Sequence, residues 1–160
     1  MLEDIKREKR AEADLAAQHR SAQDAVDARL LAHMGGYLHA LNEFKQESGW
    51  VMTLPHSGSH QTNHSGGGGA VNYRCVSVEL SPPNWAGPGP CFFFVLWFEE
   101  RGLFRRKDVL QGETYLTPNT RSWSGAGYAR RFGVAPSVDD VIIRMKAAFQ
   151  IHGVLGEPSA

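Results

Sequence analysis

The chain has no net charge and no long apolar run, and each absence excludes a class of protein. Its 17 Lys and Arg balance 17 Asp and Glu, which leaves no overall attraction to a polyanion. No segment approaches the roughly 20 consecutive apolar residues that span a bilayer. The first residues are charged rather than apolar, so they do not resemble a secretory signal. We therefore expect a soluble, cytoplasmic protein without a membrane partner.

Cysteine is also scarce, with only Cys75 and Cys91 present. These two residues lack the spacing of a zinc site or of a redox pair. They fall in separate predicted strands and could face each other, which leaves a disulfide open. Buried free thiols are nevertheless the usual state in a cytosolic protein, and we favour them here.

Catalytic and cofactor motifs of high specificity are missing as well. The glycine run at residues 66–69 precedes neither Lys-Ser/Thr nor a helix, so it fits neither a P-loop nor a dinucleotide fingerprint. Ser57, Ser122 and Ser124 lie outside any G-x-S-x-G context. We expect no cofactor, and a non-enzymatic protein is favoured over an enzyme.

A long helical pattern runs from Leu2 to Glu47. Apolar or small residues recur there at steps of three, four and seven, which match a helix and fit no strand. The apolar stripe is thin before Val26 and dense after it. The first half is therefore predicted to be solvated or weakly paired with another chain, and the second half to pack on a core. Ser48-Gly49 supplies the stop, because glycine tolerates the left-handed turn after a helix.

Gly35 and Gly36 interrupt this helical pattern. Each costs a helix about 1 kcal/mol relative to alanine, so we expect either a break into two helices or a close approach of a neighbouring backbone. A continuous helix would measure on the order of 70 Å, at about 1.5 Å per residue, which is more than the remaining chain could cover. Part of it would then project, and a projecting, weakly apolar helix commonly dimerises as a coiled coil or docks on a partner.

The rest of the chain is predicted to be a β-rich body at residues 49–153, followed by a disordered tail at 154–160. Strands are expected at 50–54, 70–80, 91–98 and 103–110, with a further short one at 114–116 and loops at 56–69, 81–90 and 117–133. A hairpin turn is expected at residues 99–102. A change of alternation near Cys75 predicts a β-bulge. Ser137 is a plausible N-cap for a short last helix that ends at Gly153.

The order of these elements predicts an α+β fold. It would combine a long N-terminal helix, possibly broken at Gly35-Gly36, an antiparallel sheet of about four strands and a short C-terminal helix packed on the sheet.

Three histidines, His56, His60 and His64, recur at four-residue spacing. On a helix they would share one face, and histidine is the commonest transition-metal ligand. The intervening Ser, Gly, Asn and Thr argue for a loop instead, and a metal site needs preorganised ligands. A solvated polar loop is the favoured interpretation. The alternative is a small metal-dependent enzyme that uses this His56–His64 loop as a lid or ligand source.

A basic, aromatic region spans residues 101–132, where seven Lys and Arg stand against two acidic residues. Arginine beside planar aromatics is typical of protein interfaces and of single-stranded nucleic-acid sites. The plainer alternative is a solvated hairpin face with ordinary core aromatics. The candidate partner-binding residues in this region are Arg105, Arg106, Trp123, Tyr128, Arg130 and Arg131.

These observations favour a non-enzymatic interaction or adaptor protein. Its N-terminal helix, within residues 1–48, would mediate self-association as a homodimer or other homo-oligomer, or docking. Its body would present the arginine and aromatic surface to a macromolecule. A protein partner is expected first, and a single-stranded nucleic acid is the alternative.

Overall fold

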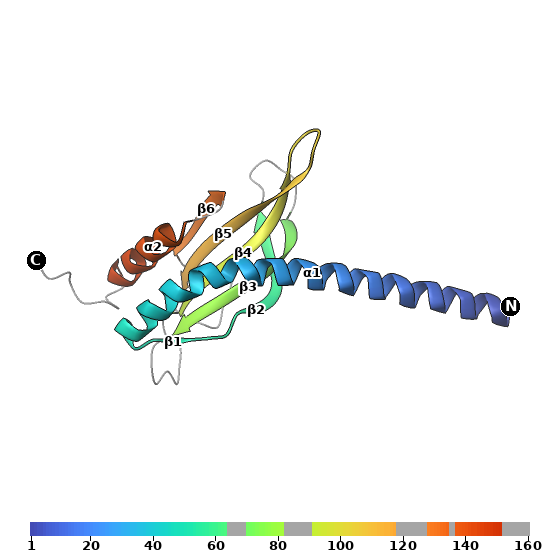
Figure 1. Ribbon diagram of the computed structural model, residues 1–160, viewed down its shortest axis with the longest axis horizontal. Helices are drawn as coiled ribbons and strands as arrows, with labels where there is room; N and C mark the ends of the chain where they lie inside the picture. Colours follow the sequence, from blue (N-terminus) through green and yellow to red (C-terminus); the bar gives the residue numbers. More distant parts are fainter. Residues whose placement is uncertain (64–69, 82–90, 118–127, 135–136, 152–160) are drawn as a thin grey trace, which may run out of the picture.

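The computed structural model describes residues 1–63, 70–81, 91–117, 128–134 and 137–151, and it confirms the α+β prediction. One long helix lies across a curled antiparallel sheet, and a short helix lies beside it (Figure 1). The elements in chain order are α1 (Leu2–Ser48), β1 (Val51–Met52), β2 (His56–Asn63), β3 (Ala70–Ser81), β4 (Cys91–Arg101), β5 (Lys107–Thr117), β6 (Tyr128–Val134) and α2 (Val138–Ile151).

The sheet follows the order β1-β3-β4-β5-β6, and β2 also pairs with β3. All pairs are antiparallel. β1 pairs with residues 80–81 of β3, whereas β2 pairs with residues 70–77. These two strands therefore run one after the other along a single edge of β3. Thr53 lies between them and donates its backbone N–H to the Glu79 carbonyl oxygen at 2.9 Å.

Helix α1 is continuous through Gly35 and Gly36. A Cβ atom added to either glycine would meet nothing within 4 Å. Both sequence-based explanations, a break or a close backbone approach, are therefore wrong, and nothing in the structure explains the pair. The helix ends as predicted at Gly49, which has a φ of 73° and donates its N–H to the Lys45 carbonyl oxygen at 2.9 Å.

The main core lies between α1 and one face of the sheet. Tyr37 of α1 packs against Phe94 of β4 with ring centroids 4.9 Å apart. Val141 of α2 joins the same cluster, so both helices cover this face. Burial of such large apolar side chains is the dominant stabilising term in a domain of this size. The other buried members are Leu30, Met34, Leu41, Phe44, Trp50, Val76, Val78, Leu80, Phe92 and Leu96.

The opposite face of the sheet holds a second, smaller cluster of Cys75, Val95 and Trp97. Strand β3 is thus buried on both faces, because Val76 and Val78 point to α1 while Cys75 points away. This explains the change of alternation near Cys75 without a bulge, and the predicted bulge is wrong. The pairing of β3 is regular there, and the register shift lies between Gly112 and Glu113 of β5.

Several segments predicted as loops or turns are strands. Residues 56–63, the described part of the predicted His56–His64 loop, form β2. Strand β6 covers residues 128–133 of the predicted loop at 117–133 and continues to Val134, and β5 is one strand where two short ones were predicted. The hairpin turn was predicted at residues 99–102 but begins only after Arg101, since residues 99–101 still pair with residues 107–109. Gly102 begins it with a φ of 125°, and a Cβ there would collide with the Arg105 carbonyl oxygen.

Both cysteines are free and buried, as favoured from the sequence. Cys75 pairs with Trp97, which is six residues along β4 from Cys91 and hence about 20 Å away, at about 3.3 Å per residue. Burial raises the pKa of Cys75 to about 11. Burial and the neighbouring Glu79 raise the pKa of Cys91 as well, and its Sγ donates to Glu79 Oε1 at 2.9 Å. Both thiols are therefore protonated and poorly reactive at neutral pH.

The start of α2 also matches its prediction. The Asp140 backbone N–H donates to Ser137 Oγ at 3.1 Å, which is an N-cap hydrogen bond. Asp139 and Asp140 lie in the first turn, where the helix dipole favours negative charge. The predicted helix end at Gly153 and the tail at 154–160 lie outside the described residues.

Candidate functional site

Helix α1 leaves the sheet near residue 27, where a partly buried ion pair joins it to β3. The two carboxylate oxygens of Asp27 accept hydrogen bonds from Arg74 Nε and Nη2, both at 2.8 Å. This fork-shaped, two-bond geometry is the strongest form of an ion pair between these residue types. The Arg74 hydrogen bonds hold the pKa of Asp27 below its usual range, and Asp27 in turn raises the pKa of Arg74.

A second ion pair joins α1 to the β4–β5 hairpin. Arg29 Nη1 donates to Asp108 Oδ2 at 2.7 Å, and the guanidinium lies 4.4 Å from the centroid of the Phe98 ring. A cation over an aromatic face is attracted by the negative face of the ring. We call Asp27, Arg29, Arg74 and Asp108 the helix clamp, because together they fix the point at which α1 departs from the body.

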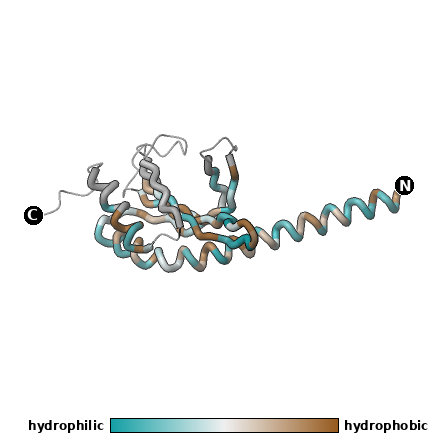
Figure 2. The backbone as a smooth tube through the Cα atoms, turned by 90° about the horizontal axis from the view of Figure 1, so that it is seen from above, coloured by the Kyte–Doolittle hydropathy of each residue, from teal (hydrophilic) through white to brown (hydrophobic). Residues whose placement is uncertain are grey.

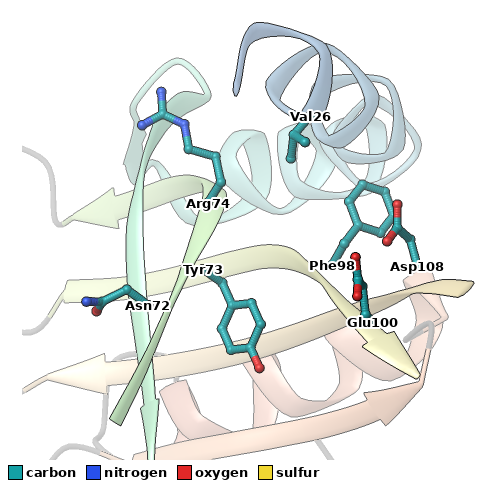
Figure 3. A pocket seen from close by; sticks show the side chains of 7 residues that line it. All are labelled: Val26, Asn72, Tyr73, Arg74, Phe98, Glu100 and Asp108. Carbon is teal, nitrogen blue, oxygen red and sulfur yellow. The ribbon is translucent and has the colours of Figure 1, made fainter. Parts of the chain in front are cut away.

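An open groove of about 400 Å³ lies beside the helix clamp. Figure 3 shows its seven lining side chains, with Phe98, Glu100 and Asp108 gathered on one side and Tyr73 and Arg74 of β3 on the other. Glu100 and Asp108 are direct cross-strand partners, which would repel each other if uncompensated. Arg29 compensates Asp108, and Arg106 Nη1 donates to Glu100 at 3.3 Å. The groove is therefore polar, aromatic and close to neutral.

Before the helix clamp, α1 projects from the body as an exposed rod (Figure 1). Every residue from 1 to 25 is exposed. The segment mixes hydrophilic and hydrophobic residues along its length without a continuous apolar stretch (Figure 2). Its larger apolar side chains, Leu2, Ile5 and Leu15, are 68, 45 and 61% exposed. We call residues 2–25 the projecting segment. It is the part of α1 that the protein's own sheet leaves uncovered.

Among the predicted partner-binding residues that the structure describes, the two pairs of arginines lie apart. Arg105 and Arg106 are exposed in the β4–β5 turn, whereas Arg130 and Arg131 lie on β6, opposite Thr114 and Glu113 of β5. The turn is separated from that register by six residues of β5, or about 20 Å. Tyr128 lies further along, opposite Leu116, and Trp123 falls outside the described residues.

The predicted histidine ligands are also separate. His56 and His60 lie four residues apart on β2, or about 13 Å. His56 Nε2 lies 3.1 Å from Ser77 Oγ, and His60 Nε2 lies 3.0 Å from Glu113 Oε2. His64 is outside the described residues. Within the part of the chain that the structure describes, no group of three His, Cys, Asp or Glu is placed to hold a metal ion.

Sequence reasoning missed the helix clamp. One signal was present, since Asp27 interrupts the dense apolar stripe between Val26 and Leu30. Its partner could not be found in this way, because Arg74 is 47 residues away and sits in a strand whose register was unknown.

Comparison of the chain with protein-family models, curated proteins and solved structures finds no significant match. Across the described ranges, no helix is long and apolar enough to cross a membrane. The case for a function therefore rests on the geometry of the projecting segment, the helix clamp and the groove.

Proposed function

We propose that this chain is a non-enzymatic interaction protein that self-associates through the projecting segment. One observation carries the proposal: α1 continues as an exposed helix well beyond the surface that its own sheet covers. A polar helix of this length is only marginally stable alone in water, and packing against another element is the usual source of its stability. A partner for this segment therefore has a physical role.

The charge pattern of the projecting segment favours a second copy as that partner. Residues 6–10 carry four Lys and Arg against Glu8, and residues 11–14 follow with two acidic residues. Two copies running antiparallel would place the basic block of each beside the acidic block of the other. A parallel pair in register would align like charges, which repel. We therefore infer an antiparallel helix pair with two-fold symmetry.

In this arrangement each body stays available for a further macromolecule. The β4–β5 turn with Arg105 and Arg106 is exposed, and the groove opens beside the helix clamp. An exposed arginine pair next to an aromatic groove suits a protein partner, since arginine and aromatic residues dominate interface energetics. The adaptor role thus joins self-association at one end to partner binding at the body.

Sedimentation equilibrium tests the self-association. Full-length protein should sediment as a dimer at tens of micromolar, and a variant lacking residues 2–24 should sediment as a monomer, since the deletion removes the pairing surface but keeps the helix clamp. The exchange of Lys6 and Arg10 for glutamate should weaken the dimer by roughly tenfold, because exposed ion pairs contribute about 0.2–1 kcal/mol each.

A compensating exchange provides the control. Adding Glu12→Lys and Asp14→Lys to the Lys6→Glu, Arg10→Glu protein should restore the dimer, because the two blocks then carry reversed but still opposite charges. Equal monomer masses for the full-length and deleted proteins at all concentrations would contradict the proposal. A dimer that survives the deletion would show that the bodies, not the projecting segments, associate.

A further inference from the structure

Gln111 of β5 is fully buried, and the described residues offer no hydrogen-bond partner to its side-chain amide nitrogen or oxygen. A buried polar group without a partner destabilises a fold, whereas an apolar residue of similar volume at the same position would not. The position is on the sheet face that α1 does not cover, because Gln111 pairs with Trp97 of the smaller cluster. A buried polar side chain that lowers the stability of the free protein in this way is consistent with a ligand that forms hydrogen bonds to it.

The surroundings of Gln111 are aromatic and enclosed. Trp97 is its direct cross-strand partner and has no exposed surface. The Trp97 indole N–H donates to Glu99 Oε1 at 3.2 Å, which fixes the ring. Cys75 and Val95 complete an apolar surface around the same ring. The Gln111 amide is therefore a polar group at the border of an apolar, aromatic region.

A bridge between distant strands closes over this region. His60 of β2 lies 3.0 Å from Glu113 of β5, although β3 and β4 separate the two strands in the sheet. The curl of the sheet makes this contact possible. The His60 ring also packs on Trp97 with centroids 4.5 Å apart. His60 and Glu113 are only 5 and 14% exposed, so their contact covers Trp97 from solvent.

We propose that Gln111, Trp97, His60 and Glu113 form a binding site for a small planar molecule with an amide-like edge. A primary carboxamide, a lactam or a protonated carboxylic acid presents one donor and one acceptor side by side, which complements the donor and acceptor of the Gln111 amide. The apolar body of such a molecule packs against Trp97. The ligand enters when His60 and Glu113 separate, and their contact then closes the site. This site is independent of the projecting segment.

Nuclear magnetic resonance with two matched probes tests this site. Benzamide carries both a donor and an acceptor, and N,N-dimethylbenzamide lacks the donor. In full-length, ¹⁵N-labelled protein, benzamide should shift the side-chain NH₂ resonances of Gln111, assigned through bonds, until they saturate. N,N-dimethylbenzamide should bind at least about tenfold more weakly, because a site built around a hydrogen bond rejects analogues that lack it. Unsaturable shifts, or equal affinity for both probes, would overturn the proposal.

Substitution of Gln111 gives a second, independent readout. Gln111→Met should abolish the saturable response to benzamide and raise the urea midpoint of unfolding, since it removes the unpaired amide. Gln61→Met is the matched control on the exposed side of β2 and should change neither quantity. A lower urea midpoint for Gln111→Met would show that the amide has a structural role in the free protein, and the ligand site would be rejected.

Discussion

At the scale of single residues, the ion pair of Asp27 and Arg74 shows how α1 is oriented on the sheet. Apolar contacts hold the helix against the sheet but permit small rotations and slides. The two parallel hydrogen bonds at 2.8 Å accept only one rotation of the helix about its axis. Arg74 remains partly exposed and hydrated, so the pair is less costly to bury than a fully enclosed one.

Replacing Asp27 by asparagine should therefore destabilise the fold in a pH-dependent way. The pKa of Asp27 is lower in the folded chain than in the unfolded chain, where it is about 3.9. The ionised carboxylate therefore contributes fully to the free energy of unfolding above the unfolded pKa, and this contribution is lost as the pH falls through the folded pKa. We expect Asp27→Asn to lower the free energy of unfolding by about 1–2 kcal/mol at pH 7. The difference from the natural protein should shrink below about pH 4.

Urea denaturation followed by circular dichroism between pH 7 and pH 2.5 measures this difference. Asp14→Asn is the control, measured like Asp27→Asn at a protein concentration below that of dimer formation, since Asp14 is an exposed residue of the projecting segment. It should leave the unfolding curve unchanged at every pH. If Asp27→Asn lowers the free energy of unfolding by the same amount at every pH down to 2.5, packing rather than charge accounts for the effect.

At the scale of elements, Gly35 and Gly36 destabilise α1, and substitution should remove this penalty. Both glycines are helical and exposed, with open space where a Cβ would lie. Gly35→Ala with Gly36→Ala should raise the free energy of unfolding by roughly 1–2 kcal/mol, because each alanine removes about 1 kcal/mol of helix penalty.

Thermal and urea unfolding of the double variant check this expectation. Gly102→Ala provides a control of opposite sign, because Gly102 has a positive φ and its Cβ would collide with the Arg105 backbone. It should destabilise the β4–β5 turn. A double alanine variant less stable than the natural protein would indicate that the glycine pair serves a state of α1 other than the straight helix.

The elements that sequence patterns predicted well are those whose own side chains determine their structure. Helix α1 and strand β4 carry long apolar patterns, and both were placed nearly at their observed bounds. Strand β2 was missed because its residues are mostly Ser, Gly, Gln, Thr and Asn, which favour loops. Its strand structure comes from eight paired positions along the next strand, β3, a pairing that the composition of β2 alone does not reveal.

The candidate site was predictable only in part for the same reason. The surplus length of α1 was evident from the sequence, and it leads to the projecting segment. The helix clamp and the Gln111 site each join residues from elements far apart in the chain. Their detection requires the register of β3, β4 and β5, which alternation alone did not supply.

At the scale of the whole molecule, the projecting segment and the body should be separable. Every residue before Val26 is exposed, so deletion of residues 2–24 should change the free energy of unfolding of the monomer by less than about 0.5 kcal/mol. The measurement is urea unfolding at a protein concentration below that of dimer formation, because association would add its own stability.

A longer deletion gives the contrast. Removal of residues 2–29 also removes Asp27 and Arg29 and should destabilise the body by at least about 1–2 kcal/mol. If the shorter deletion were equally damaging, the projecting segment would have a stabilising role within its own chain, and its assignment as an association surface would need to be withdrawn.

The helix clamp also gives α1 the mechanics of a lever. About 38 Å of helix lie on the outer side of Asp27 and about 32 Å on the inner side, at about 1.5 Å per residue, so the two arms are similar in length. Ion pairs close to a fulcrum resist torque poorly but resist an axial pull well. A sideways force on the outer arm is therefore opposed mainly by Leu41 and Phe44, at the far end of the inner arm. A sideways force that a partner applies at the N-terminus would therefore be transmitted along α1 to the packing of those two side chains in the core.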